Sequence, residues 1–262
     1  MISKSYVAFI CLLISMPLFA QELSLAESET NRAPEAGQVI LEKTPDYSSS
    51  YLQRRGTHGA LFSVIYEKFY PLDYRSLFND GHIEDIVGSD RVDLVGLEIG
   101  YKFNFRLGSL SALGNYAAGA IDGNLNGGER NLAFTKYGFS VNYALDAILA
   151  EPWVVPYVQG GAHQFVVAES DITGDLESTP NVAANYRIGL LFQLDWFENF
   201  MDDSARVERL RSSALENTFL DVYATEYLAS SKAIDPASQT GTEGDPNLHS
   251  SLELGIGLKL EF

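Results

Sequence analysis

The feature that most constrains this chain is a strict alternation of apolar and polar residues over long segments. In "DLVGLEIGYKFNFR", residues 93–106, Val95, Leu97, Ile99, Tyr101, Phe103 and Phe105 alternate with Gly96, Glu98, Gly100, Lys102, Asn104 and Arg106. A period of two places successive side chains on opposite faces of a β-strand, whereas a helix needs a period of 3.6. One face of this strand is therefore apolar throughout, and the other carries charge.

Segments with this alternation recur along the chain, separated by clusters of Gly, Asp, Asn and Ser. We expect eight strands, at residues 58–70, 91–106, 110–121, 132–147, 153–168, 182–197, 217–230 and 250–262. Several of them exceed the usual five or six residues and carry aromatic residues near their ends. Strands that cross a membrane need about 9–11 residues, with aromatic girdles at both interfaces. The pattern predicts an all-β fold, a membrane-spanning up-and-down antiparallel eight-stranded β-barrel.

The connections between these segments support the same fold. An even number of strands returns both termini to one side, which we expect to be periplasmic. The connections on that side are then the short ones at 107–109 and 149–153 and a longer one at 198–216, where Val207, Leu210 and Ala214 predict a helix. We interpret it as a surface helix, or else as a docking site for a periplasmic partner. The other connections, at about 71–90, 122–131, 169–181 and 231–249, are long and polar, as extracellular loops should be.

The N-terminal part of the chain has a different texture. Residues 1–20 combine Lys4 with an apolar run and a small-residue ending, which predicts a secretory signal peptide. The only cysteine, Cys11, lies in this segment, so we expect no disulfide after its removal. Residues 21–56 are polar and acidic and are interpreted as a mostly flexible periplasmic extension. The barrel itself is expected to span residues 57–262.

The net charge restricts the partners of the chain. Without residues 1–20 the chain has 17 basic and 35 acidic residues, a net charge of −18, so nucleic acid is not an expected partner. No later stretch approaches 18 uninterrupted apolar residues, which excludes a helical membrane protein.

The signal peptide, the eight amphipathic segments, "VPYVQGGAHQF" and the terminal "LGIGLKLEF" together resemble the eight-stranded outer-membrane β-barrel families of Gram-negative bacteria, of the OmpA, OmpX and OmpW type. The resemblance covers nearly all of residues 57–262. It implies an outer-membrane location, with lipid and lipopolysaccharide around the wall and periplasmic chaperones during insertion. In those families a last strand that ends on an aromatic residue is the signal read by the barrel-assembly machinery, and Leu258, Leu260 and Phe262 match that pattern.

The alternation also assigns charged residues to the inside of the barrel. These are Glu67, Glu98, Lys102, Arg106, Lys136, Asp146, Arg187, Asp195, Asp221, Glu253, Lys259 and Glu261. Eight strands enclose only enough space for side chains or one small ligand. Because an isolated buried charge is very costly, both signs in that space imply ion pairs. We interpret the lumen as a plugged interior held by an ionic network; a narrow channel or carrier for small solutes and a lumenal ligand site are the alternatives.

Three other motifs have candidate chemistry. In the loop "DGNLNGGER", Asp122, Asn124, Asn126 and Gly127 have the spacing of half an EF-hand calcium loop, but Ala133 stands where a bidentate Glu is needed. His249, Ser251 and Glu253 resemble the residues of outer-membrane lipid A deacylases. A lipid-modifying enzyme is therefore a third interpretation of the chain, after the plugged barrel and the channel or carrier. Residues two apart on a strand are separated by roughly 6–7 Å, too far for easy hydrogen bonding. His163 beside Gln159 is expected to be a lumenal hydrogen-bonding residue.

The remaining candidate features are the acidic residues of the extracellular loops, namely Asp80, Glu84, Asp85, Asp90, Asp171, Asp175 and Glu177. They are solvated surface in the simplest interpretation, and binding of divalent cations that bridge lipopolysaccharide, or of proteins on another cell, are alternatives. We predict no catalytic residue, no metal site and no cofactor. The expected role is a structural or surface-interaction protein, with an extracellular ligand that the residues do not identify.

Overall fold

The computed structural model describes residues 50–78, 81–123, 130–194, 215–233 and 246–262. The chain divides into two compact units, residues 1–44 and 45–262. The predicted signal peptide, most of the predicted 21–56 extension and the predicted 198–216 helix lie outside the described ranges. The barrel described below belongs to the second unit.

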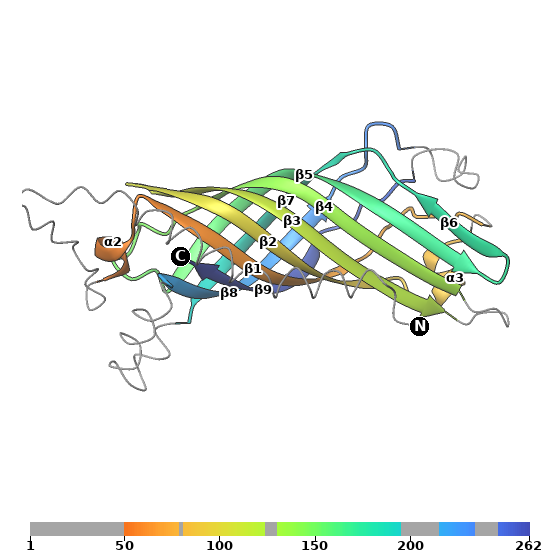
Figure 1. Ribbon diagram of the computed structural model, residues 1–262, viewed down its shortest axis with the longest axis horizontal. Helices are drawn as coiled ribbons and strands as arrows, with labels where there is room; N and C mark the ends of the chain where they lie inside the picture. Colours follow the sequence, from red (N-terminus) through yellow and green to blue (C-terminus); the bar gives the residue numbers. More distant parts are fainter. Residues whose placement is uncertain (1–49, 79–80, 124–129, 195–214, 234–245) are drawn as a thin grey trace, which may run out of the picture. The chain divides into compact units, whose positions relative to one another are not determined.

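Nine strands form one antiparallel sheet that closes on itself (Figure 1). They are β1 (His58–Phe69), β2 (Val92–Phe105), β3 (Gly108–Gly123), β4 (Arg130–Ala144), β5 (Val154–Asp171), β6 (Gly174–Ser178), β7 (Ala183–Gln193), β8 (Asn217–Tyr227) and β9 (Glu253–Glu261). The order is β4-β3-β2-β1-β9-β8-β7-β5-β6, and pairing of β4 with β5 closes the ring. β7 pairs with the first part of β5 and β6 with its last part, so these two strands occupy the same place in the wall. The barrel therefore has eight strands around its circumference, and the predicted eight-stranded antiparallel barrel is confirmed.

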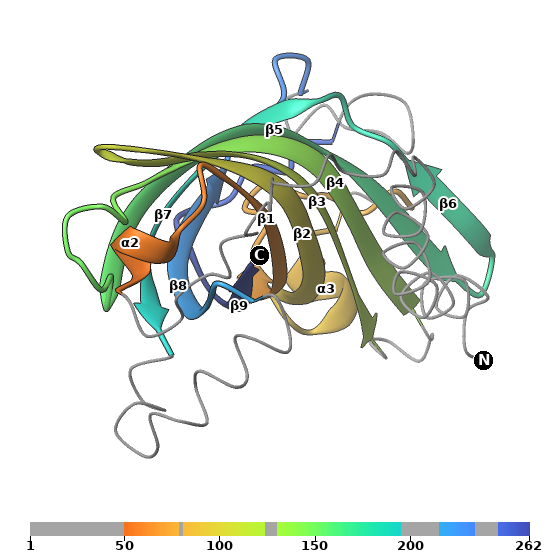
Figure 2. The same ribbon diagram turned by 60° about the vertical axis from the view of Figure 1, so that its left-hand side comes forward.

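One predicted loop is wrong. Residues 169–181 were expected to form a long polar loop, but β5 continues to Asp171 and returns at once as β6 (Figure 2). The turn consists of Ile172 and Thr173, and the backbone N–H of Thr173 donates to Asp171 Oδ1 at 2.6 Å. Gly174 follows with a φ of 154°, which a glycine adopts without strain. The polar composition of this segment reflects a hairpin that is exposed to solvent on one face.

The register of the strands determines the width of the barrel. Gly59 pairs with Lys102, and successive partners lead through Ser111, Asn142, Gln159, Arg187 and Thr225 to Glu253. Continued by two residues, the β9–β1 register places Glu253 beside Phe69, ten residues beyond Gly59. For eight strands this shear gives a strand tilt of about 40° and a radius of about 8 Å, an interior that side chains can fill.

Two short helices lie at opposite ends of the barrel. Helix α2 (Tyr51–Arg54) precedes β1, and it lies at the end where β9 finishes beside the start of β1. We call this the terminal end. Helix α3 (Ile83–Val87) belongs to the connection between β1 and β2 at the opposite end, which we call the loop end. Among the residues that the structure describes, no helix is long and apolar enough to cross a membrane.

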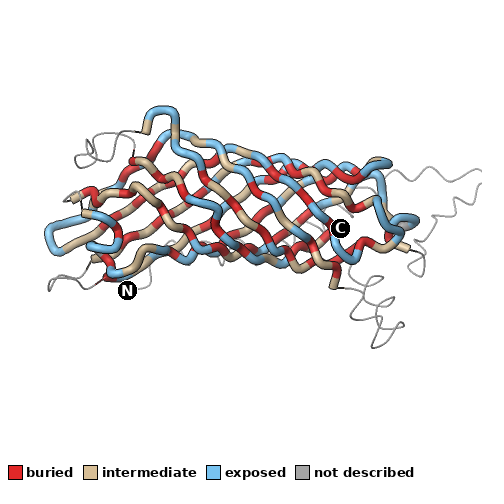
Figure 3. The backbone as a smooth tube through the Cα atoms, turned by 180° about the vertical axis from the view of Figure 1, so that it is seen from behind, coloured by how far each residue is buried: buried red, intermediate tan, exposed pale blue. Residues whose placement is uncertain are grey.

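Buried and exposed residues alternate along the strands (Figure 3), so one face of each strand lines the lumen and the other forms the outer wall. The outer wall is apolar, with large exposed side chains on every side of the barrel: Val64, Val95, Ile99, Tyr101, Phe103, Leu110, Tyr116, Tyr137, Phe139, Val141, Val158, Tyr186, Ile188, Leu190, Val222, Leu254, Ile256 and Leu258. On β2 the band from Val95 to Phe105 covers about 25 Å along the barrel axis, the height of a bilayer-facing belt. Soluble monomers rarely expose a continuous apolar surface of more than a few hundred Å².

Two adjacent glycines of β5 provide a matched test of this packing. A Cβ at Gly161 would lie 2.4 Å from the carbonyl oxygen of Phe139 and 2.7 Å from Ser140 Cβ, whereas a Cβ at Gly160 would have no atom within 4 Å. We expect Gly161→Ala to lower the free energy of unfolding by about 1–3 kcal/mol, because β4 must move. Gly160→Ala should be nearly neutral or slightly stabilising. Urea unfolding of the refolded protein in detergent measures both, and equal stability of the two variants would contradict the register.

Candidate functional site

The middle of the lumen contains ion pairs that connect opposite walls. Lys136 on β4 donates to Glu67 on β1 and to the hydroxyl of Tyr227 on β8. Arg187 on β7 pairs with Glu98 on β2 at 2.9 Å and approaches Glu67 at 3.7 Å. All four charged side chains are almost fully buried. The charges therefore neutralise one another across the lumen, between strands that share no backbone pairing.

Aromatic rings complete the surroundings of these cations. Lys136 Nζ lies 4.6 Å from the ring centre of Tyr227, and the guanidinium of Arg187 lies 3.9 Å from that of Tyr223. A cation over an aromatic face is attracted to it, more strongly where water is excluded. The rings thus supply contacts that water would otherwise make.

A second group of charges lies nearer the terminal end. Lys259 on β9 approaches Asp221 on β8 at 3.8 Å and lies 5.0 Å from the ring centre of Tyr157. The Tyr157 hydroxyl donates to Asp221 Oδ1 at 2.8 Å. Tyr157 belongs to a buried cluster with Ile65, Val155, Leu191, Phe219 and Tyr223, so this group of charges borders an apolar part of the lumen.

The terminal end of the lumen is closed by the residues that precede β1. Tyr51 is 0 % exposed, and its hydroxyl accepts a hydrogen bond from Lys102 Nζ at 2.7 Å and donates to Glu261 Oε2 at 2.9 Å. Lys102 also pairs with Asp146 at 2.7 Å and with Glu261. Arg55 donates to Asp146 Oδ1 at 2.9 Å, and its other terminal nitrogen reaches a carbonyl oxygen of β2 at 2.7 Å. We call Tyr51 and Arg55 with these three partners the terminal cluster.

Two groups of the terminal cluster lie outside the wall strands and have shifted acidities. Burial opposes ionisation of Asp146, but Lys102, Ser109 and Arg55 outweigh it and hold the pKa of this carboxyl below its ordinary value of 3.8. Burial raises the pKa of Tyr51 well above 10.0, and the neighbouring Glu261 and Asp146 raise it further. Tyr51 therefore remains a neutral phenol that both donates and accepts.

The loop end is closed by the connection between β1 and β2. Tyr74, Leu77, Ile83 and Val87 of this connection are buried. Of these, Tyr74, Ile83 and Val87 extend an apolar cluster whose lumenal members include Phe69, Leu94, Leu132, Phe134, Phe165 and Val167. The rings of Phe69 and Phe165 are stacked with centres 4.8 Å apart. The connection at 71–90, expected to be a polar extracellular loop, thus folds partly into the barrel, because its apolar residues cover an opening that the wall strands leave.

Glu169 of β5 holds this connection in place. Its carboxylate accepts hydrogen bonds from the Ser76 hydroxyl at 2.7 Å, the Leu77 backbone N–H at 2.8 Å and the Tyr74 hydroxyl at 3.2 Å. Arg130 lies 3.7 Å from the same group. A fully buried carboxylate needs several donors, and this one receives them from the connection.

Most of the residues assigned to the lumen from the alternation are buried there. They are Glu67, Glu98, Lys102, Lys136, Asp146, Arg187, Asp221, Glu253, Lys259 and Glu261. Arg106 was assigned wrongly: it is exposed, because β2 ends at Phe105 and Arg106 belongs to the following turn, although the apolar and polar pattern of the sequence continues through it. Asp195 lies outside the described residues. Within the described part of the chain, Glu253 differs from the other nine, because its side-chain hydrogen bond is to the hydroxyl of Ser251 rather than to a charged group or an aromatic residue.

The other candidates are not brought together as a catalytic or metal site. Contrary to the distance argument, Ser251 Oγ does donate to Glu253 Oε1, at 2.9 Å. His249 instead contacts Asn247 at 3.0 Å and Asp73 at 3.5 Å, and in the described ranges no hydrogen bond joins it to Ser251.

The calcium-like loop is only partly described. Asp122 accepts a hydrogen bond from Asn131, while Asn124, Asn126 and Gly127 lie outside the described residues. Within the described part of the chain, no group of three or more His, Cys, Asp and Glu side chains is placed to hold a metal ion. His163 faces the lumen, is 3 % exposed and hydrogen-bonds Asn185.

Sequence reasoning missed Tyr51, Arg55, Tyr74 and Glu169. The first three lie outside the strands, where no periodic pattern marks a buried side chain. Glu169 could have been found, because it is in phase with the lumenal residues His163, Phe165 and Val167 once β5 is extended by one residue beyond the predicted 168.

Comparisons with known proteins give structural matches only. No protein-family model matches the chain, and no curated protein matches it. Among solved structures, the chain is similar to Neisserial surface protein A, with 12 % identity and a TM-score of 0.42 over 78 % of this chain and 96 % of that one. It is also similar to Ail, the attachment invasion locus protein of Yersinia pestis, with 10 % identity and a TM-score of 0.39 over 79 % of this chain and 100 % of that one.

The central ion pairs can be tested by a double-mutant cycle on Glu67 and Lys136. Lys136→Met leaves the Glu67 carboxylate without its closest cation, and we expect a loss of about 3 kcal/mol in the free energy of unfolding. Adding Glu67→Gln should restore part of that loss, because no uncompensated charge remains. Urea unfolding in detergent gives the coupling energy, and strictly additive effects would show that the two residues do not interact.

The terminal cluster predicts an acid-dependent stability. Because the pKa of Asp146 is lowered in the folded protein, its contribution is present above the ordinary pKa of 3.8 and is lost as the pH falls through the folded value. Asp146→Asn has no titrating group, so we expect the stability difference between wild type and this variant to shrink below pH 3.8. Unfolding curves from pH 2 to pH 6 measure the difference, and a constant difference would exclude Asp146 as the source.

Proposed function

We propose that the protein is an outer-membrane β-barrel with a plugged lumen that acts as a structural or surface-interaction protein. The observation that carries this proposal is the combination of an apolar outer wall with an interior in which charges of both signs are paired. A lipid-facing wall anchors the molecule in a bilayer, because it would be unstable in water. The filled interior leaves the residues of the loop end to meet other molecules.

The orientation follows from the connections. The two-residue turn at 106–107 and helix α2 lie at the terminal end, whereas the long connections from β1 to β2 and from β8 to β9 lie at the loop end. The connection from β7 to β8 is the exception, because it is long and joins the strands at the terminal end. Barrels of this kind have short periplasmic turns and longer extracellular loops. Both termini are therefore periplasmic in this proposal, and the loop end faces the outside.

The proposed partners follow from location. Lipid and lipopolysaccharide surround the wall, and the barrel-assembly machinery and periplasmic chaperones handle the chain during insertion. Leu258 and Phe262 are exposed on the outer wall near the terminal end, where they are accessible as an assembly signal together with Leu260. Phe262 is also tied to β1 by two backbone hydrogen bonds with Ala60, of 2.8 and 2.9 Å.

A narrow channel is the competing function, and the interior argues against it. An ion on the barrel axis would have to separate Lys102 from Asp146 at the terminal end and pass the apolar cluster around Phe69 at the loop end. Each step either exposes a buried charge or places an ion in an apolar surrounding.

Planar-bilayer recording tests the proposal. The purified protein should insert, as judged by a faster gel migration before boiling than after it, and should give no stable unitary conductance. Tyr51→Ala removes the closure of the terminal end only, so the loop end should still prevent conduction. Stable unitary steps in the wild type would establish the channel and overturn the plugged barrel, and a failure to insert into lipid would overturn the membrane assignment.

A further inference from the structure

The β5–β6 hairpin extends beyond the neighbouring wall at the loop end. Pairing of β5 with β7 stops at His163 and Ala183, and pairing of β7 with β8 stops at Asn185 and Tyr227. The β5–β6 ladder begins only further out and continues to the turn. Within the described residues β6 therefore has β5 on one side and no strand on the other, as Figure 2 shows.

The outer edge of β6 presents unpaired backbone groups. Asp171 and Gly174 flank a two-residue turn, so they form a hydrogen-bonded pair of the antiparallel ladder. Alternation along the ladder then directs the N–H and C=O groups of Asp175 and Glu177 away from β5. Among the described residues these groups have no backbone partner outside the ladder. Such an edge is a template for an added strand.

The charge of the β5–β6 hairpin favours a basic partner strand. The side chains of Asp175 and Glu177 are exposed, and Asp171 lies on the neighbouring strand of the same hairpin. Arg130 is 4.0 Å from Asp171 and 3.7 Å from Glu169, so this cation is already occupied by carboxylates of β5. The exposed edge is therefore negative, and a basic segment complements it.

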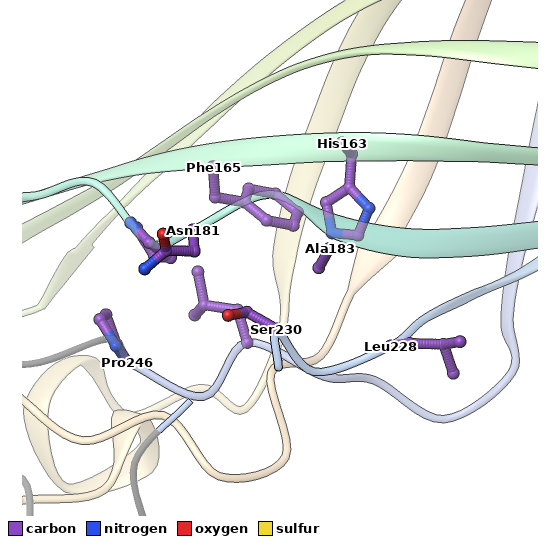
Figure 4. Close-up of a pocket in the computed structure, with 9 residues that line it drawn as sticks. His163, Phe165, Asn181, Ala183, Leu228, Ser230 and Pro246 are labelled. Atoms are coloured by element: carbon purple, nitrogen blue, oxygen red, sulfur yellow. The ribbon is translucent and has the colours of Figure 1, made fainter. Parts of the chain in front are cut away.

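A small pocket lies where β6 ends (Figure 4). It is lined by Pro180, Asn181 and Ala183 after β6, by His163 and Phe165 of β5, and by Leu228, Ser230, Pro246 and Leu248. His163 is 3 % exposed, and its Nδ1 has no hydrogen-bond partner among the described residues. The pocket has a volume of about 10 Å³, which is room for one water molecule and not for a side chain of a partner.

We propose that the outer edge of β6 binds an extended basic segment of a partner protein as an added strand. The backbone groups of Asp175 and Glu177 supply the hydrogen bonds, and their carboxylates select lysine or arginine at alternate positions. The proposal rests on the proposed function, because the loop end must face the outside for a partner to reach it.

The probe is a fluorescein-labelled, N-acetylated eight-residue peptide of alternating lysine and threonine, and its binding to the full-length protein in lipid nanodiscs is followed by fluorescence anisotropy. We expect saturable binding that weakens as salt increases. The same peptide with every backbone amide N-methylated should not bind, because neither of its edges has an N–H left to donate to β6. A glutamate-for-lysine peptide should not bind either.

Variants of β6 separate hydrogen bonding from charge. Glu177→Pro removes an outward N–H and leaves the bonds between β5 and β6 intact, so binding should weaken about fivefold or more. The double variant Asp175→Asn, Glu177→Gln keeps the edge and removes its charge, so binding should weaken severalfold and lose its salt dependence. Glu84→Gln on α3 is the matched control, since it removes one exposed acidic group of the loop end away from β6 and should bind as the wild type does.

Three results would overturn strand addition: no binding of the basic peptide to the wild type, equal binding of the N-methylated peptide, or full binding by Glu177→Pro. Gel mobility before and after boiling, measured on the same nanodisc samples, distinguishes a failure of the β6 site from a failure of the proposed function. If the barrel inserts but does not bind the peptide, only the proposed β6 site is wrong. If the chain does not insert, the proposed membrane barrel is wrong.

Discussion

The pairing of charges across the lumen is the interaction on which the rest of the structure depends. A radius of about 8 Å leaves no space for bulk water, so every charge on the inner face needs a partner inside the barrel. Glu67 on β1 finds Lys136 on β4, and Arg187 on β7 finds Glu98 on β2. Neither of these strand pairs shares a backbone ladder. The network therefore connects walls that the hydrogen bonds of the sheet do not join directly.

The two ends of the lumen are closed by different kinds of contact. At the terminal end Tyr51 enters a polar cluster, and its hydroxyl completes the coordination of Lys102 and Glu261. At the loop end the closure is apolar: Tyr74 packs in the cluster around Phe69, and the buried carboxylate of Glu169 accepts hydrogen bonds from the Tyr74 hydroxyl and the Leu77 backbone N–H. The polar closure depends on charge pairing and the apolar closure on burial of surface, so a change of pH or salt acts mainly on the first.

The wall could be predicted from the sequence because each strand carries its own signal. A side-chain period of two is visible within one segment, and β1 (58–69) differs from its expected range of 58–70 by one residue. Contacts across the lumen have no such signal, since Tyr51 and Tyr74 are buried by partners remote in the chain. Arg106 was misassigned because the alternation continues in the sequence one residue after β2 has ended. The hairpin at β6 was missed because its polar residues are typical of both a loop and an exposed strand.

The filled lumen also restricts where recognition can occur. Ion pairs, aromatic rings and apolar side chains occupy the interior, and several buried polar atoms of the described residues have no hydrogen-bond partner, among them Ser63 Oγ, Asn104 Oδ1 and His163 Nδ1. That nitrogen lies beside the point where the wall ladder is interrupted, between the end of β6 at Ser178 and the start of β7 at Ala183. The interruption removes backbone pairing from one short stretch of wall and leaves the β5–β6 hairpin attached through β5 alone. A barrel stabilised by its interior tolerates this local loss, and the stability of the lumen is what permits an unpaired edge at the rim.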